Sequence, residues 1–201
     1  MATVSDFLDS IITKYPQLDS IYHTYQFCSR YNHNKSYLVN SQDRCINFDK
    51  LTEWECSKGQ LRQSADSLSF NASGAFLIEF KSGNPLTHDN KYKKLISSVS
   101  GKVFDSDITM SSIYQELLDG EYLPQRFCLV VDASSMGIDP LGVTLAQLSI
   151  KDNDSPNVTI NKMLHDIKNA INLIPMHYSS VEIWYSQIFD TYLSLYKIIN
   201  L

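Results

Sequence analysis

The sequence predicts a mixed α/β fold of the α+β kind, in which a central sheet is flanked by helices. Three observations support this class. Apolar strand-forming residues recur through 66–81 on both sides of the turn-forming residues 71–74, which indicates a β-hairpin. Residues 127–132 form an apolar run that is typical of a buried strand. Residues 92–103 and 160–174 carry helical patterns.

The N-terminal part is predicted to be helical at first. Ser5 is the expected cap of a helix in which Phe7, Ile11 and Ile12 recur at helical spacing. Pro16 punctuates this pattern and suits the first turn of a second helix that runs to Tyr25. The shorter elements expected next are strands over 37–39 and 45–48 and a helix over 49–61.

After the hairpin, helical patterns dominate. A second helical pattern begins at Ser111, and Gly120 is its expected stop. The elements expected beyond the strand at 127–132 are a strand over 143–150, a helix over 160–174, a strand over 181–184 and a helix over 188–199. That last helix carries an apolar and aromatic stripe, which we interpret as core packing, with a homodimer seam as the alternative.

The hairpin is the feature with the clearest chemical consequence. A turn centred on residues 72 and 73 and completed by Gly74, for which a positive φ is expected, places Asp66 opposite Glu79. Side chains alternate along a strand, so Lys81 shares the face of Glu79. Directly opposed like charges destabilise a sheet. A divalent cation would offset that repulsion, and Lys81 alone would do so less completely. The competing interpretation is an ordinary edge hairpin with a solvated Glu and Lys.

Asp66, the hairpin and Glu79-Phe80-Lys81, followed by Ser82-Gly83, resemble the PD-(D/E)XK nuclease superfamily. The resemblance covers residues 49–132 and includes the order helix, hairpin, helix, strand. It implies a restriction-endonuclease-like central mixed sheet flanked by helices, with added N- and C-terminal helices. Ala65 stands where the family has a proline before its first Asp.

The resemblance also implies a reaction, which is hydrolysis of nucleic-acid phosphodiester bonds with Mg²⁺ or Mn²⁺ as cofactor. Asp66 and Glu79 would be the carboxylate ligands, since Mg²⁺ prefers hard oxygen ligands and keeps several waters. By the family pattern, the carbonyl of Phe80 is a further ligand. Many members add an acidic residue from the preceding helix, and here Glu53 and Glu55 are both candidates.

The catalytic residues implied are Asp66, Glu79 and Lys81, with Lys81 orienting the attacking water and neutralising charge on the phosphoryl oxygens. Three further lysines follow the motif within about one helix length, namely Lys91, Lys94 and Lys102. They would project on neighbouring helix faces and contact substrate phosphates. A solvated helix face is the alternative of equal weight.

Composition sets limits on these hypotheses. The 201 residues suit a single domain over 1–201, with the motif-bearing core at roughly 45–132. The net charge of −5 opposes a simple nucleic-acid binder, because such proteins tend to carry a basic face. The partner expected from the motif is nucleic acid, with DNA favoured. The alternative is a catalytically inactive nuclease-like fold that acts as a protein-binding inhibitor or adaptor.

No apolar stretch approaches the ~20 residues that span a bilayer. The first residues, Met1-Ala-Thr-Val-Ser-Asp, lack the basic region of a signal peptide. We therefore expect a cytoplasmic protein with no membrane partner.

Overall fold

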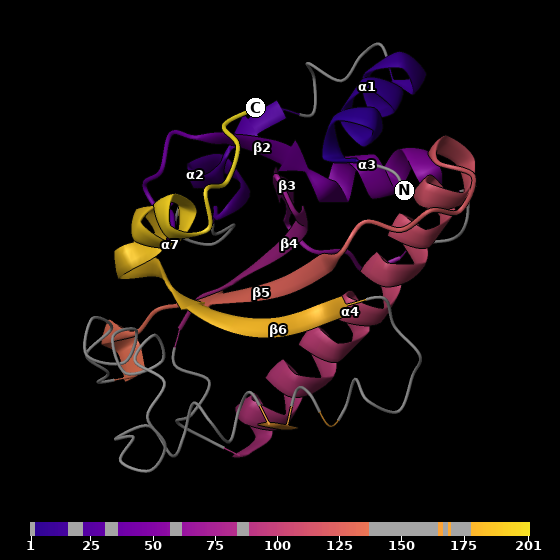
Figure 1. Cartoon of the computed structure of the whole chain (residues 1–201). Coiled ribbons are helices and arrows are strands. Elements are labelled where there is room, and N and C mark those ends of the chain that lie inside the picture. The colour runs from indigo at the N-terminus through magenta and orange to yellow at the C-terminus, as the bar shows by residue number, and fades with distance from the viewer. Residues whose placement is uncertain are drawn as a thin grey trace, which may run out of the picture.

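A six-stranded mixed sheet forms the centre of the structure, a computed structural model (Figure 1). The residues it describes are 3–15, 22–30, 36–56, 62–83, 89–136, 165–166, 169 and 178–201. The strands lie in chain order and are β1 Tyr22–Thr24, β2 Arg44–Asn47, β3 Ser67–Asn71, β4 Gly74–Lys81, β5 Gln125–Val131 and β6 Tyr178–Tyr185. β1 to β4 pair antiparallel, whereas β4, β5 and β6 pair parallel. The predicted mixed α/β class is confirmed.

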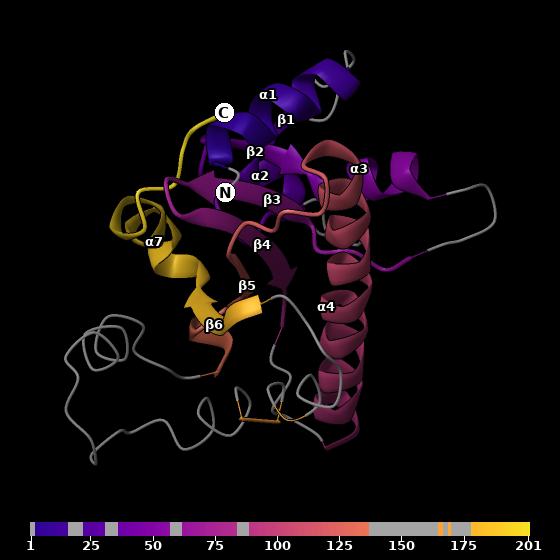
Figure 2. The same ribbon diagram turned by 45° about the vertical axis from the view of Figure 1, so that its right-hand side comes forward.

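Helices lie on both sides of this sheet (Figure 2). They are α1 Val4–Lys14, α2 Tyr25–Cys28, α3 Phe48–Glu55, α4 Asp89–Leu117 and α7 Phe189–Leu195, with 3-10 turns η3 Ser134–Met136 and η4 Ser186–Ile188. The long helix α4 covers one face, and α7 covers the other (Figure 2). Within the described ranges, no helix combines the length and apolar character that a membrane crossing requires.

Strand β4 separates the two layers because its side chains alternate. Phe76 and Phe80 point to the α7 side, where the Phe80 ring lies 5.6 Å from that of Phe189. Leu77 and Glu79 therefore point to the α4 side. All four of these β4 side chains are buried, so the sheet carries a core on each face.

The predicted hairpin and its register are confirmed. Phe70 pairs with Ala75 and Leu68 pairs with Leu77 across the β3–β4 turn. The expected role of Gly74 is wrong, since the positive-φ glycines among the described residues are Gly83 and Gly120. Gly74 is required for close packing instead: a Cβ there would lie 2.1 Å from the carbonyl oxygen of Pro124.

Three N-terminal expectations need correction. Thr3, not Ser5, caps α1, because Thr3 and Asp6 exchange hydrogen bonds in a capping box. The helix predicted to run to Tyr25 is wrong over residues 22–24, which pair with β2 as strand β1. The strand predicted over 37–39 is also absent, with only an isolated bridge between Arg30 and Tyr37.

The helical patterns at 92–103 and from Ser111 belong to one continuous helix, α4. Val99, Val103, Met110 and Ile113 are buried and keep one stripe of it against the sheet. The predicted stop is confirmed, because Gly120 follows α4 with φ of 80°.

The remaining expectations fall into two groups. The strands at 45–48, 127–132 and 181–184 correspond to β2, β5 and β6, and the helix at 49–61 is the shorter α3. The terminal stripe is core packing, as predicted, because Trp184 stacks on Tyr192 at 5.0 Å and on Tyr196 at 5.3 Å. The strand over 143–150 lies outside the described residues, as does the helix over 160–174 except at 165–166 and 169, which are helical.

Gly74→Ala should destabilise the fold, because the added Cβ would press on the Pro124 backbone and disturb the hydrogen bond from the Ala75 amide to the Pro124 carbonyl. We expect a loss of about 1–3 kcal/mol in the free energy of unfolding, measured by urea denaturation. Gly101→Ala is the matched control, since its nearest neighbour is a side-chain atom of Gln63 at 3.5 Å. In mid-helix this change should stabilise by up to about 1 kcal/mol. Equal effects of the two substitutions would contradict this account of Gly74.

Candidate functional site

The hairpin register brings Asp66 and Glu79 together at the open end of β3 and β4. Asp66 directly precedes β3, and the pairing of Ser67 with Ile78 makes Glu79 its neighbour across the hairpin. The Asp66 Oδ2 accepts a hydrogen bond of 2.7 Å from the Phe80 amide. This bond takes the place of the next backbone hydrogen bond between the two strands and fixes the Asp66 carboxylate against β4. The predicted proximity of the two carboxylates is thus present.

Glu79 is the most buried charged group of this cluster, with 0% of its side chain exposed. Its Oε2 accepts a hydrogen bond of 2.7 Å from Lys102 Nζ. Its Oε1 lies 2.7 Å from Lys81 Nζ, an ion pair that lacks hydrogen-bond geometry. Among the described residues, this buried oxygen therefore has an ionic partner but no hydrogen bond.

Lys102 reaches the cluster from the middle of α4. Besides Glu79 Oε2, its Nζ lies 3.2 Å from Oδ1 of Asp66, so one ammonium group bridges both carboxylates. Burial favours the neutral form of this amine, but the two carboxylates outweigh burial and hold the Lys102 pKa above its ordinary value. The structure places Lys102 as a partly buried counter-ion of the two carboxylates, and its predicted contact with substrate stays a prediction.

The electrostatics of Glu79 follow from its burial. Burial raises the pKa of Glu79, the Asp66 charge adds to this rise, and Lys102 and Lys81 oppose it, so that the net pKa is about 7. Near neutral pH the protonated and ionised forms of the Glu79 carboxyl are therefore both populated. A positive charge placed beside Glu79 lowers its pKa and so favours the ionised form.

Asp49, in the first turn of α3, is a nearby acidic group that the site prediction did not include. It accepts a hydrogen bond from the Ser64 hydroxyl. Burial raises the Asp49 pKa, and the charge of Asp66 adds to this rise while Lys102 opposes it. The sequence feature that could have identified Asp49 is its position at the start of the helix that precedes the hairpin.

The two acidic residues proposed from that helix point elsewhere. Glu53 is exposed and pairs with Lys50 at 2.8 Å on the helix surface. Glu55 pairs with Lys14 of α1 at 2.8 Å. Glu53 lies one helical turn after Asp49, on nearly the same side of α3, but its carboxylate is exposed and paired with Lys50. The structure therefore brings neither Glu53 nor Glu55 to the carboxylate pair, and their role as metal ligands stays a prediction.

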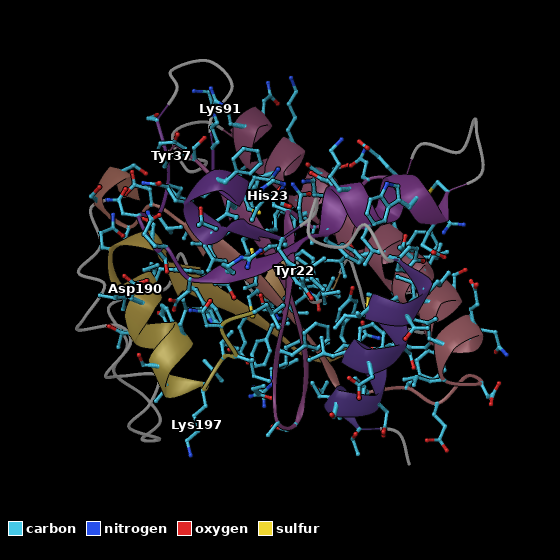
Figure 3. The ribbon with its side chains drawn as sticks, turned by 90° about the horizontal axis from the view of Figure 1, so that it is seen from above. Tyr22, His23, Tyr37, Lys91, Asp190 and Lys197 are labelled. Atoms are coloured by element: carbon cyan, nitrogen blue, oxygen red, sulfur yellow. The ribbon has the colours of Figure 1, made fainter. Side chains whose placement is uncertain are left out.

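Lys91 and Lys94 are exposed near the start of α4, and Lys91 lies at the rim of the molecule (Figure 3). At 1.5 Å per residue, they are about 16 Å and about 12 Å from Lys102 along the helix axis. The structure thus separates them from the carboxylates. Their role as phosphate contacts stays a prediction.

The donor set suits a hard divalent cation. A strand residue directs its amide and carbonyl to the same neighbour, so the Phe80 carbonyl points, like its amide, toward the Asp66 side. Two carboxylates and one carbonyl leave positions for water and phosphate, which is how Mg²⁺ is usually held. Within the described ranges, no three His, Cys, Asp or Glu side chains gather as metal ligands. An all-side-chain metal cage is therefore not formed by those residues.

A separate cleft of about 800 Å³ opens at the carboxyl ends of β4, β5 and β6. It lies on the α7 side of β4, so it is separate from the lysine–carboxylate cluster. Its described lining includes Ser82, Asp132 and Asp190 and contains no Lys or Arg. Tyr37 and Asp190 mark this side of the molecule in Figure 3. The charge of this cleft does not suit a phosphate.

The chain matches no family model, no curated protein and no solved structure.

The raised pKa of Glu79 makes stability depend on pH. The folded protein holds a proton on this carboxyl to about pH 7, whereas the unfolded chain releases it near 4.5. The free energy of unfolding should therefore fall as pH rises through this window, by at most about 3 kcal/mol. Glu79→Gln removes this titration. In chelator, urea denaturation should show wild type losing stability relative to Glu79→Gln between about pH 4 and about pH 8. Parallel pH profiles would contradict the burial account.

Proposed function

We propose that the protein is a metal-dependent nuclease whose site is formed by Asp66, Glu79 and Lys81. One observation carries this proposal: two carboxylates from neighbouring strands lie close enough for a single ammonium group, that of Lys102, to contact both. A point between two such oxygens is where a divalent cation gains most from their charge. DNA as the substrate and a cytoplasmic location are part of the proposal.

The order of elements around the site supports a restriction-endonuclease-like arrangement. Helix α3 precedes the β3–β4 hairpin, α4 follows it, and β5 returns parallel to β4. This is the order that the PD-(D/E)XK resemblance implies. The terminal helices α1 and α7 are added to that core.

The residues divide the work of hydrolysis between them. Mg²⁺, when bound, would polarise the scissile phosphate and acidify a bound water. The Phe80 amide holds Asp66 in place, which limits the reorganisation that binding would require. Lys81 ends β4 with 27% of its side chain exposed, so its ammonium can face the attacking water and the phosphoryl oxygens. The water oxygen would bond to phosphorus as the P–O ester bond breaks, the water would release its proton to solvent, and the leaving ester oxygen would take up a proton.

Substitution of the cluster should abolish cleavage. Asp66→Ala, Glu79→Ala and Lys81→Ala should each reduce metal-dependent degradation of plasmid and single-stranded DNA by at least about 100-fold. The assay compares Mg²⁺, Mn²⁺ and chelator, and far-ultraviolet circular dichroism checks that each variant is folded. Asp9→Asn, an exposed carboxylate on α1, should cleave like wild type. Equal cleavage by all of these proteins would refute the site.

A second candidate function, an inactive fold that binds a protein partner, is favoured by one observation. Two lysines match the charges of Asp66 and Glu79, so this carboxylate pair is neutralised with no metal. In that case neither Mg²⁺ nor Mn²⁺ would stabilise the protein, and no nucleic acid would be degraded. Metal-induced stabilisation that Asp66→Ala removes would favour the nuclease.

A further inference from the structure

Lys102 occupies the position that a divalent cation would take. Its Nζ lies 2.7 Å from Glu79 Oε2 and 3.2 Å from Asp66 Oδ1. A Mg²⁺ ion bound to the same two oxygens would lie about 2.1 Å from each. The ammonium group and the ion would overlap, so the carboxylate pair holds one of them at a time.

Charge balance leads to the same exclusion. Asp66 and Glu79, when ionised, carry two negative charges, and Lys81 and Lys102 carry two positive ones. A divalent ion added to these four groups would leave an excess of two positive charges, of which nearby Asp49 could offset one, beside a carboxylate that has no exposure to water. Excess charge in such a site is costly because solvent screens it poorly. Withdrawal of Lys102 removes one of these charges and frees both oxygens.

The side chain of Lys102 is suited to leave. Its backbone belongs to α4. Its ammonium group is carried on a four-carbon stem with rotatable bonds, so the ammonium can shift without any movement of the backbone. Its side chain is 18% exposed, which gives it a route toward solvent. Asp66, in contrast, is fixed by the Phe80 amide, so the carboxylate stays when the lysine withdraws.

We propose that Lys102 is a built-in competitor for the metal: it holds the carboxylate pair together in the metal-free protein and is displaced when a divalent cation binds. This proposal rests on the metal site of the proposed function. It assigns Lys102 two effects of opposite sign, since the lysine stabilises the metal-free fold and weakens metal binding. A substrate-binding lysine would not have the second effect.

The test measures Mn²⁺ affinity of the metal-free protein by isothermal titration calorimetry. Lys102→Met keeps an unbranched apolar stem and removes the ammonium group with its charge, so we expect a dissociation constant lower than that of wild type by at least about tenfold. Lys93→Met, an exposed position on the same helix, is the control and should bind like wild type. In chelator, Lys102→Met should also unfold at a lower temperature than wild type, and Mn²⁺ should raise its Tm more.

Unchanged or weaker Mn²⁺ binding by Lys102→Met, with binding retained by wild type, would overturn this proposal and leave the nuclease intact. Failure of both proteins to bind Mn²⁺ would overturn the metal site itself.

A second measurement needs no variant. Acetylation of wild-type lysines, read by mass spectrometry, should increase at Lys102 when Mg²⁺ is added and stay constant at Lys94. Unchanged acetylation of Lys102 at saturating Mg²⁺ would also overturn the proposal.

Discussion

Burial of the Glu79 carboxylate is the constraint on which the rest of the site depends. Taking an ionised group out of water costs several kcal/mol unless charge partners and hydrogen bonds replace the lost hydration. Asp66 makes the problem worse, because it places a second carboxylate beside the first. The two lysines compensate, one from the same strand and one from α4. The position of α4 on the sheet is therefore tied to the chemistry of the hairpin.

The hairpin was predictable because its determinants are local. Alternation with period two and a short turn fix which residues face each other, and the observed register agrees. The reason for Gly74 was not predictable, because it depends on the approach of Pro124, fifty residues later in the chain. Strand β1 was missed for a related reason. The segment 22–24 is short and half-buried, and its pairing with β2 is what makes it a strand.

In the candidate site, too, the features set by local sequence were predictable and those set by tertiary packing were not. Asp66, Glu79 and Lys81 came from one hairpin, and the structure places them together. Lys102 was selected correctly as a neighbour, but its role depends on how α4 crosses the sheet, which helical spacing does not specify. Of the acidic residues of α3, Asp49 lies near Asp66 and Lys102, whereas Glu53 is exposed one turn further along and Glu55 pairs with Lys14 of α1. How closely each turn of α3 approaches the hairpin depends on tertiary packing, which the sequence pattern does not specify.

The end of β4 separates two chemically different regions. On the α4 side lies a compact cluster of opposite charges, and on the α7 side lies an open cleft whose described lining carries carboxylates and hydroxyls. Under the proposed function, a phosphodiester would approach the first region, where lysines and a cation would offset its charge. The acidity of the second disfavours a polyanion there. This segregation answers part of the objection raised by the net charge of −5.

The most direct test of the central claim is the anomalous scattering of Mn²⁺ in crystals of the wild-type protein. The account predicts a peak between the carboxylates of Asp66 and Glu79, with the Lys102 side chain moved away from both. Crystals soaked to saturation that show no peak there, with Lys102 still bridging the two carboxylates, would contradict it.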